Sequence, residues 1–368
     1  MTLGDLPTPC LVLDRSRLRR NLQTMADVAR RHGVALRPHM KTAKSVDVAR
    51  MAIAGEEGGI TVSTLAEAEY FAAHGMTDIV YAVGITPQRL DRVVALNAGG
   101  ARIAVITDDL AMASRIGALP VPPRTLVEID TGEGRGGLGP GSPALPEVAG
   151  RLGRALGGVL THGGHSYAAR GTAALQAVAE GERAGAVAAA ERLRALGHAC
   201  PVVSVGSTPT ALHAAHLDGV TEIRPGVYMF GDLFQAAIGS HAADDIAVTV
   251  LSSVVGLRPD ARRFLIDAGA LALSKDRSTE ATAHDRLFGL VLDVNGTPAF
   301  GDACVERAYQ EHGVVRVPDG VAFPALSVGD RVRVVPNHAC LTAAAHDRYH
   351  VVDGDGALAA VWPRVNGW

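Results

Sequence analysis

The chain has 368 residues, a formal net charge of −3 and 48% hydrophobic residues. This length suits two domains, with ample apolar material for a large core. The nearly balanced charge argues against nucleic acid as a partner, and no apolar run approaches the ~20 residues of a membrane helix. The four cysteines are widely scattered and the N-terminus lacks a signal-peptide pattern, so we expect a cytoplasmic protein.

Lysine is scarce in this chain. Only three of the 35 basic residues are lysines, namely Lys41, Lys44 and Lys275. Arginine stays protonated in proteins, so it can neither form an imine nor shuttle a proton. The remaining lysines are therefore expected where the amine itself is needed, although any one of them can also be a chance surface residue.

The first two-thirds of the chain alternates between short β-branched or apolar runs and helical stretches rich in Ala, Leu and Arg. Repeated βα units predict a parallel sheet covered by helices, and about eight units predict a closed (β/α)₈ barrel. The predicted strands are Pro9–Leu13, Val34–His39, Gly59–Ser63, Ile79–Val83, Arg102–Ile106, Thr125–Asp130, Gly158–Thr161, Val202–Val205 and Glu222–Met229.

Lys41 follows the second predicted strand, in the run RPHMKTAKS. Chemistry in such barrels sits at the C-terminal ends of strands. Partial desolvation and the neighbouring cationic side chains of Arg37 and His39 would lower the pKa of the Lys41 amine and make it nucleophilic. We predict that Lys41 is a nucleophile, the alternative being a salt-bridged loop lysine. Lys44 is interpreted as a helix-start residue near the site.

Two further strand ends carry polar loops. In DTGEGRGG, residues 130–137, glycines would allow close approach to a ligand, and Arg135 could reach a phenolate or carboxylate. In HGGHSY, residues 162–167, histidine and tyrosine are suited to acid–base work or to holding a ring nitrogen. One histidine of that pair can equally be structural.

A late strand end carries GSTPT, residues 206–210, ahead of a helix. Backbone N–H groups and small hydroxyl residues at a helix start favour an anion, and barrels often bind phosphate late in the strand order. Gly226 and Tyr228, which follow the next strand, could close around the same phosphate. The alternative is an ordinary helix-capping turn.

From about His241 the pattern changes to strands joined by short Gly, Asp and Pro turns, which predicts an antiparallel β domain. We expect residues 10–240 to form the barrel, and residues 241–368, with residues 1–9, to form the second domain. The predicted strands there are Val248–Gly256, Arg263–Ile266, Leu287–Val294, Ala303–Arg316, Arg331–Val335 and Arg348–Val352.

His338 and Cys340 stand two residues apart after one of these strands. An extended segment would place both side chains on one face, and imidazole with thiolate suits zinc. Two protein ligands would leave positions for water and substrate. A buried free cysteine beside an unrelated histidine is the alternative.

Together these motifs resemble the fold-type III pyridoxal-phosphate enzymes. The likeness is to the branch that holds D-serine dehydratase, D-threo-3-hydroxyaspartate dehydratase and D-threonine aldolase. The stretches that carry it span nearly the whole chain: TPCLVLD, RPHMKTAKS, EIDTGEGRGG, GGHSY, SVGSTPTA, EIRPGVYMFGD, DAGALALSKD and PNHACLTAAAHD. One departure is Ala43, where the family often has histidine.

The resemblance implies an alanine-racemase-like barrel, a C-terminal β domain and a homodimer. It implies a Schiff base at Lys41, a catalytic role for Lys41 and His165, and a divalent metal, zinc or else manganese or magnesium. The implied cofactor contacts are Lys41, Arg135, Tyr167, Gly206, Ser207, Thr208 and Tyr228, and the implied metal ligands are His338 and Cys340.

The resemblance implies a lyase acting on small D-β-hydroxy-α-amino acids. Because Cys340 accompanies the metal histidine, where the aldolases commonly have Asp, we expect a dehydratase that gives a keto acid and ammonia. The alternative is an aldolase that gives glycine and an aldehyde, with His165 or metal-bound water as base. An amino-acid racemase and a non-catalytic cofactor carrier are further alternatives, against which the metal pair argues.

Overall fold

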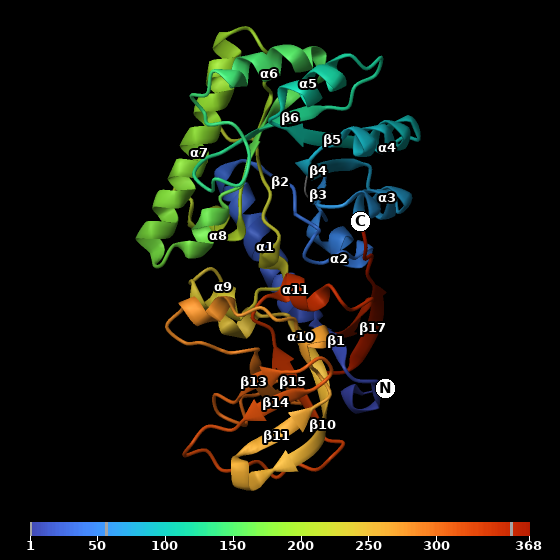
Figure 1. Ribbon diagram of the computed structural model, residues 1–368, viewed down its shortest axis with the longest axis vertical. Helices are drawn as coiled ribbons and strands as arrows, with labels where there is room; N and C mark the ends of the chain where they lie inside the picture. The colour runs from blue at the N-terminus through green and yellow to red at the C-terminus, as the bar shows by residue number, and fades with distance from the viewer. Residues whose placement is uncertain (1, 56–57, 354–355) are drawn as a thin grey trace. The chain divides into compact units, whose positions relative to one another are not determined.

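The computed structural model describes residues 2–55, 58–353 and 356–368, and the chain divides into two compact units (Figure 1). One unit, called here the barrel unit, comprises Gln23–Gly226 and Val365–Trp368. The other, called here the β unit, comprises the segment up to Leu22 together with Val227–Arg364.

Within its described residues, the barrel unit has eight parallel strands in the order β2-β9-β8-β7-β6-β5-β4-β3. The two ends of this sheet meet where His39 forms a parallel bridge with Thr61, and where the Met40 N–H donates to the Thr61 carbonyl over 2.7 Å. The predicted barrel is therefore confirmed. Its strands are β2 Ala35–Leu36, β3 Ile60–Val62, β4 Asp78–Gly84, β5 Arg102–Thr107, β6 Thr125–Ile129, β7 Leu156–Thr161, β8 Val202–Val205 and β9 Glu222–Ile223.

Helices follow the strands because capping residues start them and apolar stripes bury one face. Thr64 accepts the N–H of Glu67 over 3.0 Å, and Asp109 accepts that of Met112 over 2.7 Å. Between the strands, a buried apolar cluster that includes Val80 and Leu126 packs the sheet. The helices are α1 Arg15–His32, α2 Val46–Ala52, α3 Leu65–Ala73, α4 Pro87–Ala98, α5 Leu110–Gly117, α6 Ala144–Leu152, α7 Thr172–Ala195 and α8 Thr208–His213.

The β unit contains a sheet in the order β11-β14-β13-β12-β15-β10-β1-β16-β17, and a further β10–β11 pairing closes its first six strands into a ring. All pairs are antiparallel except β1 with β16. The strands are β1 Cys10–Asp14, β10 Val248–Arg258, β11 Arg263–Ile266, β12 Leu290–Asp293, β13 Cys304–Ala308, β14 Gly313–Arg316, β15 Arg331–Val335, β16 Arg348–Val352 and β17 Leu358–Pro363. Short helices α9 Leu233–Ala237, α10 Ala270–Leu273 and α11 Ala339–Ala343 accompany them.

Three strand predictions differ from the structure. The first strand of the predicted series, β1, pairs with β10 and β16 in the β unit, because an apolar run does not specify its non-local partner. The predicted Ala303–Arg316 strand is a hairpin of β13 and β14. The predicted Glu222–Met229 strand ends after Ile223, and a 3₁₀ helix forms at Val227–Met229. Among the described helices, none is both long enough and apolar enough to cross a bilayer.

Candidate active site

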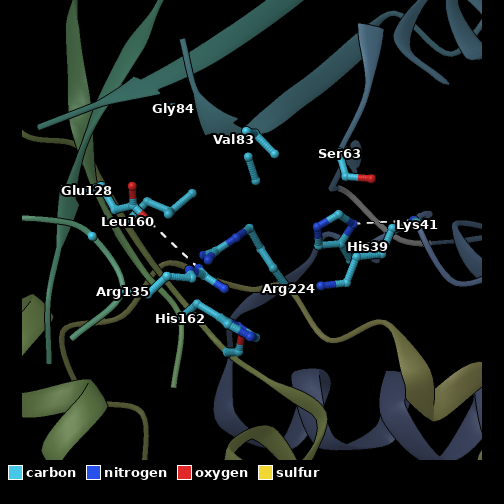
Figure 2. Close-up of a pocket in the computed structure, with 13 residues that line it drawn as sticks. His39, Lys41, Ser63, Val83, Gly84, Glu128, Arg135, Leu160, His162 and Arg224 are labelled. Carbon is cyan, nitrogen blue, oxygen red and sulfur yellow. Dashed lines mark hydrogen bonds and ion pairs between the residues drawn. The ribbon is translucent and has the colours of Figure 1, made fainter. Parts of the chain in front are cut away.

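A cavity of about 420 Å³ lies among the C-terminal ends of the barrel strands (Figure 2). Its size fits the range of small-molecule sites, and its position is where barrels place their chemistry. The lining residues come from the last residues of several strands and from the loops that follow them. The residues lining the cavity are His39, Lys41, Ser63, Ala82, Val83, Gly84, Glu128, Arg135, Gly136, Leu160, His162, Gly206 and Arg224.

Lys41 enters this cavity from the turn after β2, and its N–H donates to Nδ1 of His39 over 3.4 Å. Lys44 pairs with Glu67 at 3.2 Å, and Lys275 donates to the Ala308 carbonyl over 2.7 Å. The Lys41 amine, in contrast, forms no hydrogen bond or ion pair with any residue that the structure describes. An amine without such contacts is available to a ligand.

Arg37 does not lie beside the Lys41 amine, contrary to our expectation. Its guanidinium donates to Glu222 over 2.8 Å and to Asp78 over 2.9 Å. These carboxylates belong to the first residues of β9 and β4, at the opposite end of the strands from Lys41. Arg37 therefore stabilises the barrel base, because a buried guanidinium needs charged partners.

The cavity is electrostatically positive. Burial, reinforced by nearby Lys41, lowers the pKa of His162 to about 3, and the same causes hold the pKa of His39 well below its usual value. Both imidazoles are therefore neutral at pH 7. The side chains of Lys41, Arg135 and Arg224 are the other basic groups in the lining. Such a pocket favours an anionic ligand.

Arg224 is a site residue to which the sequence reasoning assigned no role of its own, although it lies in the run that contains Gly226 and Tyr228. It follows β9, is buried, and donates to Ser204 Oγ over 2.6 Å and to the Thr161 carbonyl over 2.5 Å. Burial lowers its pKa to about 10, and carboxylates including Glu222 and Glu182 oppose that shift. Its position in the EIRPGVY run, directly after a strand, was the available signal.

Arg135 comes from the Gly-rich loop after β6 and faces Glu128 across the cavity. Its guanidinium lies 3.8 Å from the Glu128 carboxylate (Figure 2). It also lies 3.6 Å from the Glu133 carboxylate. Burial raises the pKa of Glu128, a second residue that the motifs did not reveal. The predicted cofactor residue Arg135 therefore lies in the same cavity as Lys41.

Gly206 also lines the cavity, and its backbone takes a φ of +121° that favours glycine. A Cβ at this position would lie 2.9 Å from the Arg224 amide nitrogen. Ser207 caps α8, and its Oγ lies 2.9 Å from Ser166 Oγ. The predicted residues Ser207 and Thr208 follow Gly206 directly and are buried. Neither of them lines the cavity.

Glu182 from α7 connects the loops after β7 and β8. Its Oε1 accepts the N–H of Gly163 over 2.5 Å and that of Gly206 over 3.0 Å. The side chain is buried, which raises its pKa, and these bonds oppose the increase. Glu182 therefore fixes the position of the Gly206 turn from behind.

His165 and Tyr167 do not line the cavity, although both were predicted as site residues. They lie on the 3₁₀ helix Gly164–Ala168. The His165 ring lies beside Gly132, where an added Cβ would be 3.3 Å from Nε2 of the ring. Nδ1 of His165 is buried without a hydrogen-bond partner among the described residues. Tyr228, also predicted, is buried in the 3₁₀ helix Val227–Met229 of the β unit.

The predicted metal pair lies in the β unit. His338 is the N-cap of α11 and Cys340 lies in its first turn, so the pair does not occupy the extended segment that we expected. The two side chains are nevertheless hydrogen-bonded, and Nδ1 of His338 lies 3.5 Å from Asp276 Oδ2. The described part of the chain contains no group of three or more His, Cys, Asp or Glu arranged to hold a metal.

Carboxylates hold this pair in place. Burial raises the pKa of Asp276, but the hydrogen bonds from His338 and Ser278 outweigh it and bring the value to about 2. Asp232 accepts the N–H of Ala339 over 3.0 Å, and burial raises its pKa to about 6. An imidazole and a thiol held side by side are donors that suit zinc.

Residues 13–233 match the family described as "Alanine racemase, N-terminal domain", and residues 247–352 match "Putative serine dehydratase domain". The chain is 45% identical over 381 residues to D-threo-3-hydroxyaspartate dehydratase of Delftia sp. (strain HT23), covering 100% of this chain and 99% of the relative. The solved structure of that relative superposes with a TM-score of 0.95, covering 100% of both chains.

Two other relatives carry different names. D-serine dehydratase of Dictyostelium discoideum is 29% identical, covering 97% of this chain and 96% of that protein. D-threonine aldolase of Arthrobacter sp. is 30% identical, and the match covers 98% of this chain and 92% of that protein. The chain belongs to the fold-type III pyridoxal-phosphate family of lyases that contains these dehydratases and aldolases.

Proposed function

We propose that this protein is a pyridoxal-phosphate- and metal-dependent dehydratase of D-β-hydroxy-α-amino acids, with D-threo-3-hydroxyaspartate as its preferred substrate. The unengaged Lys41 amine in a cavity lined by Arg135 and Arg224 carries this proposal. The substrate assignment rests on the 45% identity with the Delftia dehydratase. The products would be a keto acid and ammonia.

The residues present fit the cofactor. Lys41 would hold it covalently, Arg135 would face its phenolate side, and the Gly206 turn, with Ser207 and Thr208, would hold its phosphate. Tyr167 and Tyr228 are further proposed contacts. The place of Gly206 in the cavity lining, where a Cβ would come within 2.9 Å of the Arg224 amide nitrogen, supports this assignment. When bound, the cofactor supplies an electron sink for a carbon acid.

The chain's own groups would then divide the work. Lys41 would take the α-proton of the substrate, and the positive cavity would hold the substrate carboxylate. His338 and Cys340 would hold a divalent metal, zinc foremost, that supplies Lewis acidity toward the β-hydroxyl. The hydrogen bond between the two side chains supports this pairing.

Product analysis tests the proposal. Purified enzyme with cofactor and zinc would be given D-threo-3-hydroxyaspartate, D-serine and D-threonine, with and without a chelator. We expect keto acid and equimolar ammonia, fastest from D-threo-3-hydroxyaspartate and lost with the chelator. Glycine and an aldehyde as sole products would instead identify an aldolase, which the 30% identity with D-threonine aldolase makes the second candidate.

The aldolase reaction would need a base for the β-hydroxyl, for which His165 remains the proposed residue. Its buried Nδ1, which lacks a partner among the described residues, supports this choice. If glycine and an aldehyde are the products, a His165→Asn variant should lose their formation. We also propose a cytoplasmic homodimer, which light scattering of the purified protein and cell fractionation would test.

A further inference from the structure

A second cavity, of about 640 Å³, lies in the β unit. Its wall includes Arg331 and Arg333 on β15, the N-terminal turn Thr2–Gly4, and Val294 with Asn295 after β12. Part of its wall is apolar, since Leu3 belongs to a buried apolar cluster against which the partly buried Val294 packs. None of these residues lines the barrel cavity that contains Lys41.

Strand geometry directs both arginines to the same face of β15. Alternate residues of a strand face opposite sides, so Arg331 and Arg333 share a face while Val332 and Val334 take the other. Val332 and Val334 are fully buried. Arg331 and Arg333 are therefore roughly 7 Å apart along the strand, on the face that lines the cavity.

Arg333 is buried without a charged partner. Its side chain is 9% exposed, and its single hydrogen bond in the described structure runs from Nε to Thr249 Oγ1 over 2.9 Å. No carboxylate of the described chain lies within ion-pair distance of it. Burial lowers its pKa to about 10, while Asp14 and Asp293 compensate only from a distance.

Nearby carboxylates are engaged elsewhere. Asp293 accepts the N–H and the hydroxyl of Thr297, and Asp330, which also lines the cavity, accepts the N–H of Ser327 over 2.7 Å. Arg331 donates to Ser253 Oγ and to the Leu6 carbonyl, and its Nε is buried without a partner. Within the described structure the two Nη groups of Arg333 make no hydrogen bond, whereas those of Arg331 are engaged and add positive charge to the cavity wall.

We propose that Arg333, supported by Arg331, forms a binding site for a small oxyanion, a carboxylate or phosphate, separate from the barrel cavity. A guanidinium whose Nε is occupied presents its two Nη groups as a fork that matches an oxyanion. A buried cation without a partner destabilises a fold, so an anion that binds there stabilises it. This proposal is independent of the reaction catalysed in the barrel.

Titration with anions tests the site. Protein saturated with pyridoxal phosphate would be titrated with inorganic phosphate, malonate and, as a salt control, chloride. Calorimetry would give the dissociation constant and a thermal scan the melting temperature. We expect phosphate or malonate, but not chloride, to bind and to raise the melting temperature, and the two titrations distinguish a phosphate from a carboxylate site.

Variants locate the binding. Arg333→Met should raise the dissociation constant at least about tenfold, equivalent to one lost charge-assisted hydrogen bond. Without anion, Arg333→Met should melt no lower than the parent, because it removes a buried unpaired charge. Arg333→Lys keeps the positive charge but lacks the two Nη groups of the guanidinium, and it should bind the anion several-fold more weakly. This variant replaces Arg333→Met in the test if Arg333→Met fails to fold.

Two control variants exclude other locations. Arg258→Met removes an exposed guanidinium of the β unit, and Arg135→Gln alters only the barrel cavity. Both should bind phosphate and malonate as the parent does. The proposal is overturned if the parent binds neither anion, if Arg333→Met and Arg333→Lys bind both unchanged, or if Arg135→Gln alone abolishes binding.

Discussion

The Asp276 carboxylate lies 3.5 Å from Nδ1 of His338, and Ser278 holds that carboxylate through its N–H over 2.9 Å and its hydroxyl over 2.5 Å. This chain of contacts fixes the rotation of the imidazole ring. A metal held together with Cys340 would then be bound through the other ring nitrogen, Nε2. Carboxylates that orient a metal-binding histidine in this way tune both its position and its basicity.

Replacing Asp276 with Asn should therefore weaken metal binding about 10- to 100-fold, the range typical for such outer contacts. Competition with a chromophoric chelator would measure the affinity, and elemental analysis would measure the retained metal. Asp302→Asn is the control, since Asp302 is exposed in the same unit and pairs with Arg286 at 2.8 Å. Equal metal affinity in both variants would contradict the proposed orienting role.

Of the three lysines, only Lys41 should carry the cofactor. Borohydride reduction followed by peptide mass spectrometry should find the reduced adduct on Lys41. Lys41→Arg should abolish both the adduct and the visible absorption band, because arginine keeps the charge but cannot form an imine. Lys44→Arg should retain both, since Arg can maintain the ion pair with Glu67. An adduct on Lys44 or Lys275 would refute the assignment.

Gly206→Ala should lower cofactor affinity more than protein stability. Strain at φ +121° and the 2.9 Å approach to Arg224 together should cost about 1–3 kcal/mol and displace the turn. Gly197→Ala is a matched control, with φ +85° but no atom within 4 Å of the added Cβ. It should cost about 1 kcal/mol in urea unfolding and leave the cofactor dissociation constant unchanged. A loss of affinity in both variants would argue against a specific phosphate turn.

Acid should destabilise the barrel unit through His162. Its pKa falls from 6.5 to about 3 on folding, mainly through burial, so the unfolded chain binds more protons between these values. The stabilising contribution is complete above pH 6.5 and is lost as the pH falls toward 3. Over that window the unfolding free energy should decrease by up to a few kcal/mol.

Urea unfolding at a series of pH values would measure this dependence. His162→Asn can preserve the hydrogen bond to the Gly206 carbonyl, which spans 3.0 Å in the structure, without a proton to gain. It should flatten the pH dependence in this window, whereas His284→Asn, at an exposed histidine, should leave it unchanged. A slope equal to the parent's in His162→Asn would rule out this source.

The sequence predicted the barrel because alternating apolar periods are local properties of each segment. It did not predict that β1 pairs in the other sheet, since a strand's partners are set by distant residues. The motifs led to Lys41, Arg135 and Gly206, which lie in one cavity. They did not reveal Arg224, whose burial depends on acceptors at Ser204 and Thr161.

Side-chain direction was the harder problem. Arg37 and Lys41 are near neighbours in sequence, yet Arg37 pairs with Glu222 and Asp78 at the strand starts. Only the positions of those two acids decide that orientation. Likewise, the hydrogen bond between His338 and Cys340 depends on the start of α11, which the HAC motif alone does not specify.

The bridge between His39 and Thr61, which closes the ring of strands, stands two residues before Lys41. The next residue, Met40, is bonded to Thr61 and also accepts the N–H of Lys44 over 2.7 Å. Lys41, whose amine is proposed to carry the cofactor, therefore lies next to the point where the ring of strands closes. The absorption band of a cofactor bound to Lys41 would therefore report on ring closure, and it should be lost in denaturant when the pairing of His39 and Met40 with Thr61 opens.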